Sequence, residues 1–409
     1  MRHPVGVGRA AGRTAWGARV VAMALLAAVT LGAWTPPGDV ARGQPATHPL
    51  QIVLFIGDGM GHQHLELLRA YRHSKPFVDE LEPAASLATR SLSGVTDSAA
   101  AATALSTGHP TANGMVAMGP HGERWPTLLE RAKQAGMRVG LVSTTTVTDA
   151  TPAAFAAHVE RRQEHQSVAR QYLDLGVDVI LGGGRYQWAH RTPDGGGQAL
   201  LERARSLGYL VVQASSELRT VAQKAAERSQ AAGEQAKLLG LFADGPMAYE
   251  AERPPHQPSL AEMTETALRW LDGGSGQPFV LVVEAGRIDH LGHEGRVDIL
   301  PQEMQALDEA VGVALRFAAK RPGTLVVLTA DHETGGLERS AARIWYFRWP
   351  GGHTSREVPL RVKGAGAERF QGLRHLTDVG GVLSRLVEER TALTVHQSTG
   401  GCGVWSGLS

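Results

Sequence analysis

The sequence has very little cysteine: Cys402 is the only one in 409 residues. A single cysteine excludes an internal disulfide framework, and it also excludes a zinc site built from several thiolates. The chain has no excess of charge of one sign either, because 41 lysines and arginines stand against 40 aspartates and glutamates. A dedicated nucleic-acid-binding protein needs a basic excess or a basic stripe, so no nucleic-acid partner is expected.

No hydrophobic run is long enough for an ordinary transmembrane helix. One apolar run covers residues 20–34, and four arginines precede it with no acidic residue before Asp39. A basic stretch, a short apolar stretch and a Pro/Gly-rich segment in this order are typical of a secretory signal. We therefore expect residues 1–46 to be a signal peptide and linker, and the protein to be exported to the periplasm or the extracellular space. Stable membrane association is expected only if this segment stays uncleaved.

Short apolar runs rich in β-branched residues alternate with stretches of helical periodicity along the rest of the chain. This alternation predicts an α/β fold with a mostly parallel central sheet sandwiched by helices. The expected strands are Ile52–Ile56, Val139–Ser143, Val177–Leu181, Tyr209–Val212, Phe279–Val283, Leu325–Thr329 and Val358–Val362. The expected helices are Thr127–Ala135, Gln166–Leu175, Ala199–Ser206, Leu260–Leu271 and Gln302–Ala319. We expect a single domain over residues 47–390 and a flexible tail over residues 391–409.

Four of the expected strands are followed closely by acidic, hydroxyl or histidine side chains. In open α/β sheets, ligands bind outside the carboxyl ends of the strands. The segments at these four ends contain Asp58; Asp149 and Thr151; Glu284, Asp289, His290 and His293; and Asp331 with His332. The sequence therefore predicts an active site along this edge of the sheet.

Each of these groups also has an ordinary interpretation when it is taken alone. Asp58 lies between glycines, where turns favour aspartate. Asp289 and His293 are four positions apart, a spacing that equally suits a surface pair on a helix. His353 follows two glycines, as many loop histidines do. Their joint placement favours metal binding instead, because nitrogen and oxygen ligands without cysteine suit catalytic Zn²⁺, and carboxylates with a hydroxyl suit Mg²⁺.

A serine precedes a run of alanines in the segment from Val95 to Gly108. Thr96 or Asp97 is a good N-cap, the alanines favour a helix, and Gly108 suits its end. Ser98 would then lie in the first helical turn, where free backbone N–H groups favour an anion. It either merely begins a helix or acts as a nucleophile. No G-x-S-x-G elbow surrounds it, so activation by a metal fits better than a hydrolase triad.

At this point the sequence closely resembles the alkaline phosphatases. The resemblance covers about residues 50–388, and its motifs occur in the order found in that family. The matching segments are Phe55–Gly61, Val95–Gly108, Thr148–Arg162, Val177–Gly184, Glu284–Gly295, Thr329–Gly336 and Gly351–Leu360. The resemblance implies a metal-dependent phosphomonoesterase that acts on small-molecule phosphate monoesters with two zinc ions and one magnesium ion.

The resemblance also implies a role for each matching residue. Ser98 becomes phosphorylated, and Arg162 clamps the phosphate, with Arg161 as the alternative if the register shifts by one. The zinc next to Ser98 is held by Asp58, Asp331 and His332; the second zinc by Asp289, His293 and His353; and the magnesium by Asp58, Thr151 and Glu284. Two neighbouring metals and a planar guanidinium suit an in-line displacement at phosphorus.

Two features depart from the commonest family pattern. Asp149 and His290 are expected next to the magnesium ligands, and this pair combines features associated with bacterial and with animal relatives. We expect the pair to tune magnesium affinity and phosphate release. His332 and His353 are only 21 positions apart, so the insertion called the crown is short or absent. The family's usual homodimer, to which that region contributes in relatives, is therefore in question.

Two other functions compete with a phosphomonoesterase. One is a diesterase or sulfatase of the same superfamily, but Ser98 lacks the C/S-x-P-x-R context of sulfatases, and diesterases usually replace the magnesium ligands that are present here. The other is a catalytically inactive metal- or phosphate-binding protein, although every expected ligand and the nucleophile are intact.

Overall fold

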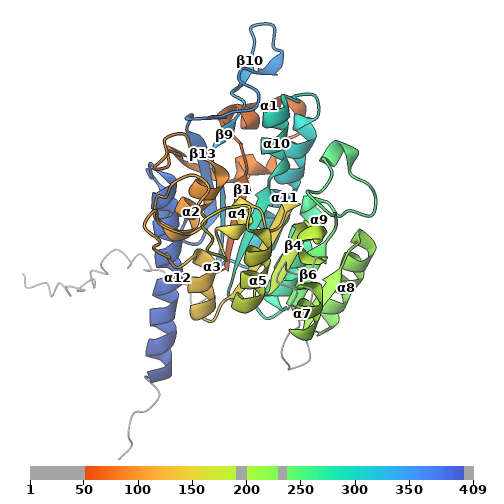
Figure 1. Cartoon of the computed structure of the whole chain (residues 1–409), viewed down its shortest axis with the longest axis vertical. Helices are drawn as coiled ribbons and strands as arrows, with labels where there is room; N and C mark the ends of the chain where they lie inside the picture. The colour runs from red at the N-terminus through yellow and green to blue at the C-terminus, as the bar shows by residue number, and fades with distance from the viewer. Residues whose placement is uncertain (1–50, 190–199, 229–236, 400–409) are drawn as a thin grey trace, which may run out of the picture. The chain divides into compact units, whose positions relative to one another are not determined.

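The computed structural model describes residues 51–189, 200–228 and 237–399, and its centre is a nine-stranded mixed sheet (Figure 1). In spatial order the strands are β2 (Glu82–Leu87), β13 (Val358–Gly364), β8 (Thr324–Thr329), β1 (Gln51–Gly57), β7 (Phe279–Ala285), β3 (Arg138–Thr146), β4 (Val179–Gly183), β6 (Lys237–Leu241) and β5 (Tyr209–Val212). Only β13 runs against its neighbours, and the pairs from β8 to β5 are all parallel. The predicted α/β fold is confirmed.

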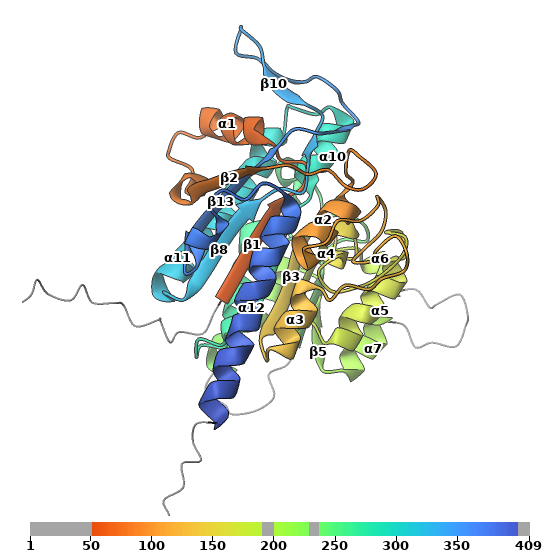
Figure 2. The same cartoon turned by 90° about the vertical axis from the view of Figure 1, so that its left-hand side faces the viewer.

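Helices cover both faces of this sheet. They are α1 (His62–Tyr71), α2 (Ser98–Thr107), α3 (Leu128–Gln134), α4 (Ala150–Ala153), α5 (His165–Leu175), α6 (Arg185–Ala189), α7 (Leu200–Ser206), α8 (Ser215–Arg228), α9 (Leu260–Asp272), α10 (Arg287–Glu294), α11 (Leu300–Lys320) and α12 (Leu376–Thr399), with short 3₁₀ turns at Phe77–Glu80, Glu250–Glu252 and Ala367–Phe370. Helices α2, α3 and α12 pack together on one face (Figure 2), and α9 packs against α11 on the other (Figure 1). From β1 to β4 the chain crosses the sheet in one direction, and from β6 to β8 it crosses in the opposite direction. Right-handed crossovers made in opposite directions place their helices on opposite faces of the sheet.

The central strands are apolar throughout because helices cover both of their faces. Every residue of β1, β7 and β8 is buried. All seven expected strands form, with shifts at their ends, and the five expected helices form as well. Strands β2 and β6 were not predicted from the sequence. β2 lies at the edge of the sheet and combines proline, alanine and serine in place of a β-branched run, so its sequence carries little strand signal.

Two small sheets form in the short segment from Glu333 to Thr354. Strand β9 (Glu333–Thr334) pairs with β12 (His353–Thr354), and β10 (Leu337–Arg339) pairs with β11 (Trp345–Phe347) in a hairpin that projects from the sheet edge (Figure 1). The β9–β12 pair places His353 opposite Thr334. The short connection therefore brings the second histidine back to the strand end that carries the first.

The C-terminal helix extends into the segment in which a flexible tail was expected. Helix α12 continues to Thr399, whereas a flexible tail was expected from residue 391. Residues 391–399 contain neither glycine nor proline, and the first helix-breaking residues are Gly400 and Gly401. The expected signal peptide and linker, residues 1–46, and the last ten residues lie outside the described part. Among the described residues, no helix has both the length and the apolar character needed to cross a membrane.

Candidate active site and metal centre

Four neighbouring strands, β8, β1, β7 and β3, deliver the polar side chains to one edge of the sheet. Asp58 follows β1, Asp331 and His332 follow β8, Glu284 is in β7, and Asp149 comes just after β3. Parallel neighbours end at the same edge, as shown by the pairing of Ile56 with Glu284 and Thr329. Six of the predicted ligands gather here into two groups of three, each compact enough to hold one metal ion.

The first group, Asp58, Asp331 and His332, is buried. One oxygen of each carboxylate is already bonded: Asp331 Oδ1 accepts the N–H groups of Gly59 and His332, and Asp58 Oδ2 accepts the Thr151 hydroxyl at 3.5 Å. The other oxygens, Asp58 Oδ1 and Asp331 Oδ2, have no hydrogen-bond partner in the described part. They lie 3.6 and 3.2 Å from His332 Nε2. Two free carboxylate oxygens thus face one ring nitrogen.

The protonation state of His332 follows from its other contact. Its Nδ1 lies 3.1 Å from Thr334 Oγ1, and that hydroxyl donates its hydrogen to Asp289 Oδ1 at 2.5 Å. Thr334 has one hydroxyl hydrogen, so it accepts from His332 Nδ1–H, and Nε2 is left with a lone pair. Two carboxylate oxygens and an imidazole lone pair repel one another unless a cation lies between them, so this group fits a metal ion.

Burial and the mutual repulsion of these groups shift their pKa values. Burial, and then the charges of Asp331 and Asp289, raises the pKa of Asp58 well above its ordinary value. Burial and Asp289 raise the pKa of Asp331 to about 7. Burial also lowers the pKa of His332 well below its ordinary value, which keeps the ring neutral. A bound cation would remove the penalty on the carboxylates, and a neutral imidazole is the form that ligates metals.

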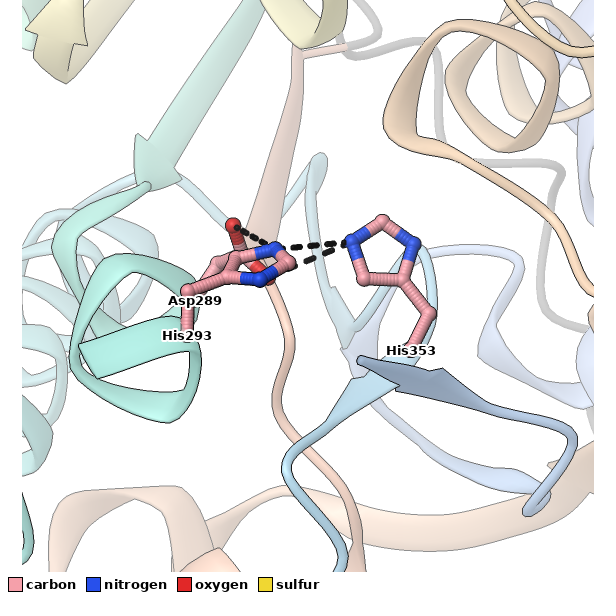
Figure 3. A group of neighbouring side chains, drawn as sticks. All are labelled: Asp289, His293 and His353. Atoms are coloured by element: carbon pink, nitrogen blue, oxygen red, sulfur yellow. Dashed lines mark hydrogen bonds and ion pairs between the residues drawn. The ribbon is translucent and has the colours of Figure 1, made fainter. Parts of the chain in front are cut away.

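The second group joins helix α10 to strand β12. His293 and His353 approach each other with their Nε2 atoms 3.0 Å apart, beside Asp289 (Figure 3). His293 Nδ1 lies 3.0 Å from Gly351 O, and His353 Nδ1 lies 2.8 Å from Thr96 O. A carbonyl oxygen only accepts, so each Nδ1 carries the hydrogen and each Nε2 presents a lone pair. Metal-binding histidines are typically oriented in this way.

Ser98 begins helix α2, and its side chain lies against the first group. Asp97 caps this helix by accepting from Ala100 N at 3.0 Å, and Gly108 ends it with φ of 77°. This agrees with the helix predicted around Ser98 and selects Asp97 over Thr96 as its cap. Ser98 Oγ lies 3.3 Å from His332 Nε2. The hydroxyl therefore stands both in the anion-favouring first turn of a helix and next to the candidate metal ligands.

Arg162 points into this site and Arg161 points away from it. Arg162 Nη1 donates to Asp97 at 3.3 Å and Nη2 donates to Asp149 at 3.2 Å. Burial disfavours its charge, but Asp149 and Asp97 outweigh burial and raise the pKa of Arg162 above its ordinary value. The Arg161 side chain is 81% exposed and lies beside Glu164. Of the two arginines, Arg162 contacts the residue that caps the Ser98 helix, and Arg161 makes an ion pair at the surface.

Further oxygen ligands gather behind Asp58. Glu284 is buried and accepts from Ser143 and, at 3.1 Å, from Thr145, and burial raises the pKa of Glu284 to about 7. Thr151 reaches Asp58, as described above. Asp149 and His290, the pair expected beside the magnesium ligands, have different contacts: Asp149 accepts from Arg162 and caps α4, whereas His290 Nδ1 contacts Arg287. Four partners of the site could not be identified in the sequence, because serine, threonine and N-cap aspartate are common everywhere and only the folded chain brings these residues to the candidate ligands: Asp97, Ser143, Thr145 and Thr334.

An α/β sheet whose edge carries two carboxylate–histidine groups beside a serine in the first turn of a helix has the arrangement of a metal-dependent phosphatase. The chain belongs to the alkaline phosphatase family, whose model matches residues 50–350. It is 34% identical over 310 residues to alkaline phosphatase 3 of Bacillus subtilis, with 72% of this chain and 63% of that protein covered.

Two other comparisons cover nearly the whole of the protein compared. Streptomycin-6-phosphate phosphatase of Streptomyces griseus is 32% identical, with 91% of this chain and 98% of that protein covered. The solved alkaline phosphatase of the Antarctic bacterium TAB5 is 25% identical with a TM-score of 0.74, and 83% of this chain and 99% of that one are covered. The chain spans only about three fifths of the length of the first curated relatives that it matches.

Proposed function

We propose that this protein is an alkaline phosphatase that hydrolyses phosphate monoesters through a phosphorylated Ser98, with two zinc ions and one magnesium ion. The proposal is carried by three groups that converge on the lone pair of His332 Nε2. Ser98 Oγ lies 3.3 Å from this nitrogen, and the other two are the carboxylate oxygens that have no hydrogen-bond partner among the described residues. Such a set of acceptors favours a cation, and a cation next to a serine hydroxyl makes it a nucleophile.

The donor sets support the choice of metals. The first group offers two carboxylates and one imidazole, and the second offers one carboxylate and two imidazoles, which suits zinc with an open position. Asp58, Thr151 and Glu284 supply only oxygen and would hold magnesium. A solved variant of the TAB5 enzyme has magnesium bound in a site named M3, which agrees with a magnesium site in this family.

The residues of the chain supply the positioning that phosphoryl transfer requires. Asp97 and Asp149 fix the plane of Arg162, and each bonded Nη of Arg162 keeps a second N–H for a phosphate oxygen. Ser98 Oγ forms a bond to phosphorus while the bond to the ester oxygen breaks and the alcohol leaves with a proton. Water then displaces Ser98 and releases phosphate. Metals in the two groups would neutralise the charge on the attacking and leaving oxygens.

The experiment that tests this function is hydrolysis of p-nitrophenyl phosphate at pH 7 and pH 9, before and after EDTA treatment. We expect activity that is higher at pH 9, is abolished by EDTA and returns with Zn²⁺ and Mg²⁺ together. The Ser98→Ala variant, purified identically, controls for host phosphatases. Cleavage of a diester or a sulfate ester in preference to the monoester would contradict the proposal. So would a protein that holds its metals and cleaves none of the three.

Export and assembly are part of the proposal. The basic and apolar pattern in residues 1–46 supports export to the periplasm or outside the cell, and the N-terminal sequence of mature protein from the culture tests it. The resemblance to the alkaline phosphatases implies that the crown, which contributes to dimer contacts, would lie between His332 and His353, and this chain has the short β10–β11 hairpin there. The mass of the purified protein in solution distinguishes a homodimer from a monomer.

A further inference from the structure

We propose that Thr334 is a positioning residue that couples the two metal groups, because its one hydroxyl orients His332 in the first group and Asp289 in the second. This inference rests on the proposed metal binding and adds a residue to it. Thr334 lies in β9, is 1% exposed, and is not itself one of the candidate ligands.

The hydroxyl of Thr334 makes both contacts at once. It donates to Asp289 Oδ1 at 2.5 Å and accepts from His332 Nδ1 at 3.1 Å. The first bond fixes the Asp289 carboxylate through Oδ1, which lies 3.7 Å from His353 Nε2, and leaves Oδ2 facing His293 Nε2 at 3.4 Å. The second bond fixes the tautomer of His332 and points the Nε2 lone pair toward Ser98 and the carboxylates. Orienting contacts of this kind raise metal affinity.

The backbone around Thr334 holds that hydroxyl in place. Thr334 N donates to Gly59 O at 3.1 Å, in the turn that follows Asp58. A Cβ on Gly59 would lie 3.0 Å from Thr334 Oγ1, and a Cβ on Gly292 would lie 2.9 Å from Thr334 Cγ2. Close packing on two sides leaves the side chain little rotational freedom. The residue thus touches the Asp58 turn and helix α10, and it pairs with His353 across the β9–β12 ladder.

Substitution by valine removes the hydroxyl while keeping the branched shape. In Thr334→Val, His332 Nδ1–H and Asp289 Oδ1 both lose their partner, so both ligands become less well oriented. We expect zinc to leave each group at least about tenfold faster than in the unchanged protein, the lower end of the effect of such partners. Thr334→Ser keeps the hydroxyl and should restore most of the retention.

Zinc release to a colorimetric chelator measures this effect, and two single-site backgrounds separate the groups. In His353→Ala the retained zinc reports the group of Asp58, Asp331 and His332. In His332→Ala it reports the group of Asp289, His293 and His353. The matched control is Thr264→Val, because Thr264 is equally buried and its hydroxyl donates to Leu260 O within α9 at 2.8 Å, away from both metal groups. This control should leave zinc release unchanged.

The coupling is refuted if Thr334→Val speeds release in one background only or in neither. If the valine variant does not fold, Thr334→Ala, which removes the same bonds without adding a methyl, takes its place. A full-length unsubstituted protein that retains no zinc would contradict the proposed function. Two retained zinc ions that are indifferent to Thr334 would contradict only this inference.

Discussion

His353 Nδ1 donates to the carbonyl oxygen of Thr96 at 2.8 Å, two residues before the serine that begins helix α2. The second candidate metal group is therefore tied to the segment that carries the candidate nucleophile. The first group touches the same serine through His332 Nε2, and the rings of His332 and His353 stack with centroids 3.6 Å apart. The position of Ser98 relative to both groups is thus fixed, as a displacement that uses two metals requires.

Removal of the His353 imidazole should cost the protein one zinc ion. The second group would keep only Asp289 and His293, too few ligands for a catalytic zinc site. We expect metal analysis of His353→Ala to find about one zinc fewer per chain than in the unchanged protein. His375→Ala is the matched control, since His375 is also half-buried and contacts a backbone carbonyl, that of Arg90, at 2.9 Å. Equal zinc content in both variants would contradict the assignment.

Removal of the Ser98 hydroxyl should abolish turnover and leave phosphate binding intact. The metal ligands and Arg162 stay in place in Ser98→Ala, so the phosphate still meets its partners. We expect kcat to fall by a factor on the order of a thousand or more, while inorganic phosphate still protects the protein against thermal unfolding. Ser106→Ala is the control, because Ser106 lies on the same helix and its hydroxyl oxygen accepts from Leu128 N. Full activity in Ser98→Ala would rule out Ser98 as the nucleophile.

Replacement of Arg162 by lysine should weaken phosphate binding more than catalysis. Lysine keeps the charge but loses the planar pair of donors that Asp97 and Asp149 hold in place. We expect KM for p-nitrophenyl phosphate and the inhibition constant for phosphate to rise about tenfold, which is the loss of roughly one charge-assisted hydrogen bond. Arg161→Lys, at the exposed neighbouring position, should change neither constant. If Arg161→Lys raised both constants and Arg162→Lys raised neither, Arg161 would be the residue that binds the phosphate.

Replacement of Asp149 by histidine should weaken magnesium binding. Asp149 caps α4, which carries Thr151, and it anchors Arg162. Loss of its negative charge removes attraction for a dication and frees the guanidinium. We expect the Mg²⁺ concentration for half-maximal activation to rise about tenfold and phosphate release to become faster. Asp174→His, at an exposed aspartate paired with Arg203, is the control. No change in either quantity would refute the tuning role.

The ligands could be predicted from the sequence because of a general property of parallel sheets. Asp58, Glu284 and Asp331 each come at or after the end of an apolar run, and neighbouring parallel strands end at one edge. The hydrogen-bond partners could not be predicted in this way. Ser143 meets Glu284 across 141 positions of sequence, and a serine in a buried strand has no pattern that identifies its partner.

The end of the C-terminal helix shows a second limit of prediction from the sequence. The low periodicity beyond residue 390 suggested a tail, but α12 continues through residues that do not interrupt a helix. Periodicity reports which face is buried and not whether a turn continues. Helix α2 was predictable for the opposite reason: Asp97 and Gly108 signal its two ends chemically. Boundaries marked by capping residues are visible in the sequence, and the continuation of a helix through a segment without periodicity is not.

The last prediction concerns Glu303, a glutamate outside the active site whose side chain is buried in helix α11. Burial raises the pKa of Glu303 from its ordinary value of 4.5 to about 7, and its Oε1 accepts from Glu250 N at 2.6 Å. Between pH 4.5 and about pH 7, the Glu303 carboxyl keeps its proton in the folded protein and has lost it in the unfolded chain. The stability that Glu303 contributes is therefore complete below about pH 4.5 and is lost as the pH rises through about 7.

Glutamine at this position keeps the acceptor for Glu250 N and does not titrate. We expect Glu303→Gln to match the unchanged protein at pH 4.5 and to be more stable at pH 8, by at most about 3 kcal/mol, the free energy that corresponds to the pKa difference. Urea unfolding of both proteins in the presence of EDTA at the two pH values measures this. Glu309→Gln, at an exposed position of the same helix, controls for a lost charge. Equal stability of Glu303→Gln and the unchanged protein at pH 8 would mean that Glu303 is ionised at no cost, and that water or a cation reaches it in the folded state.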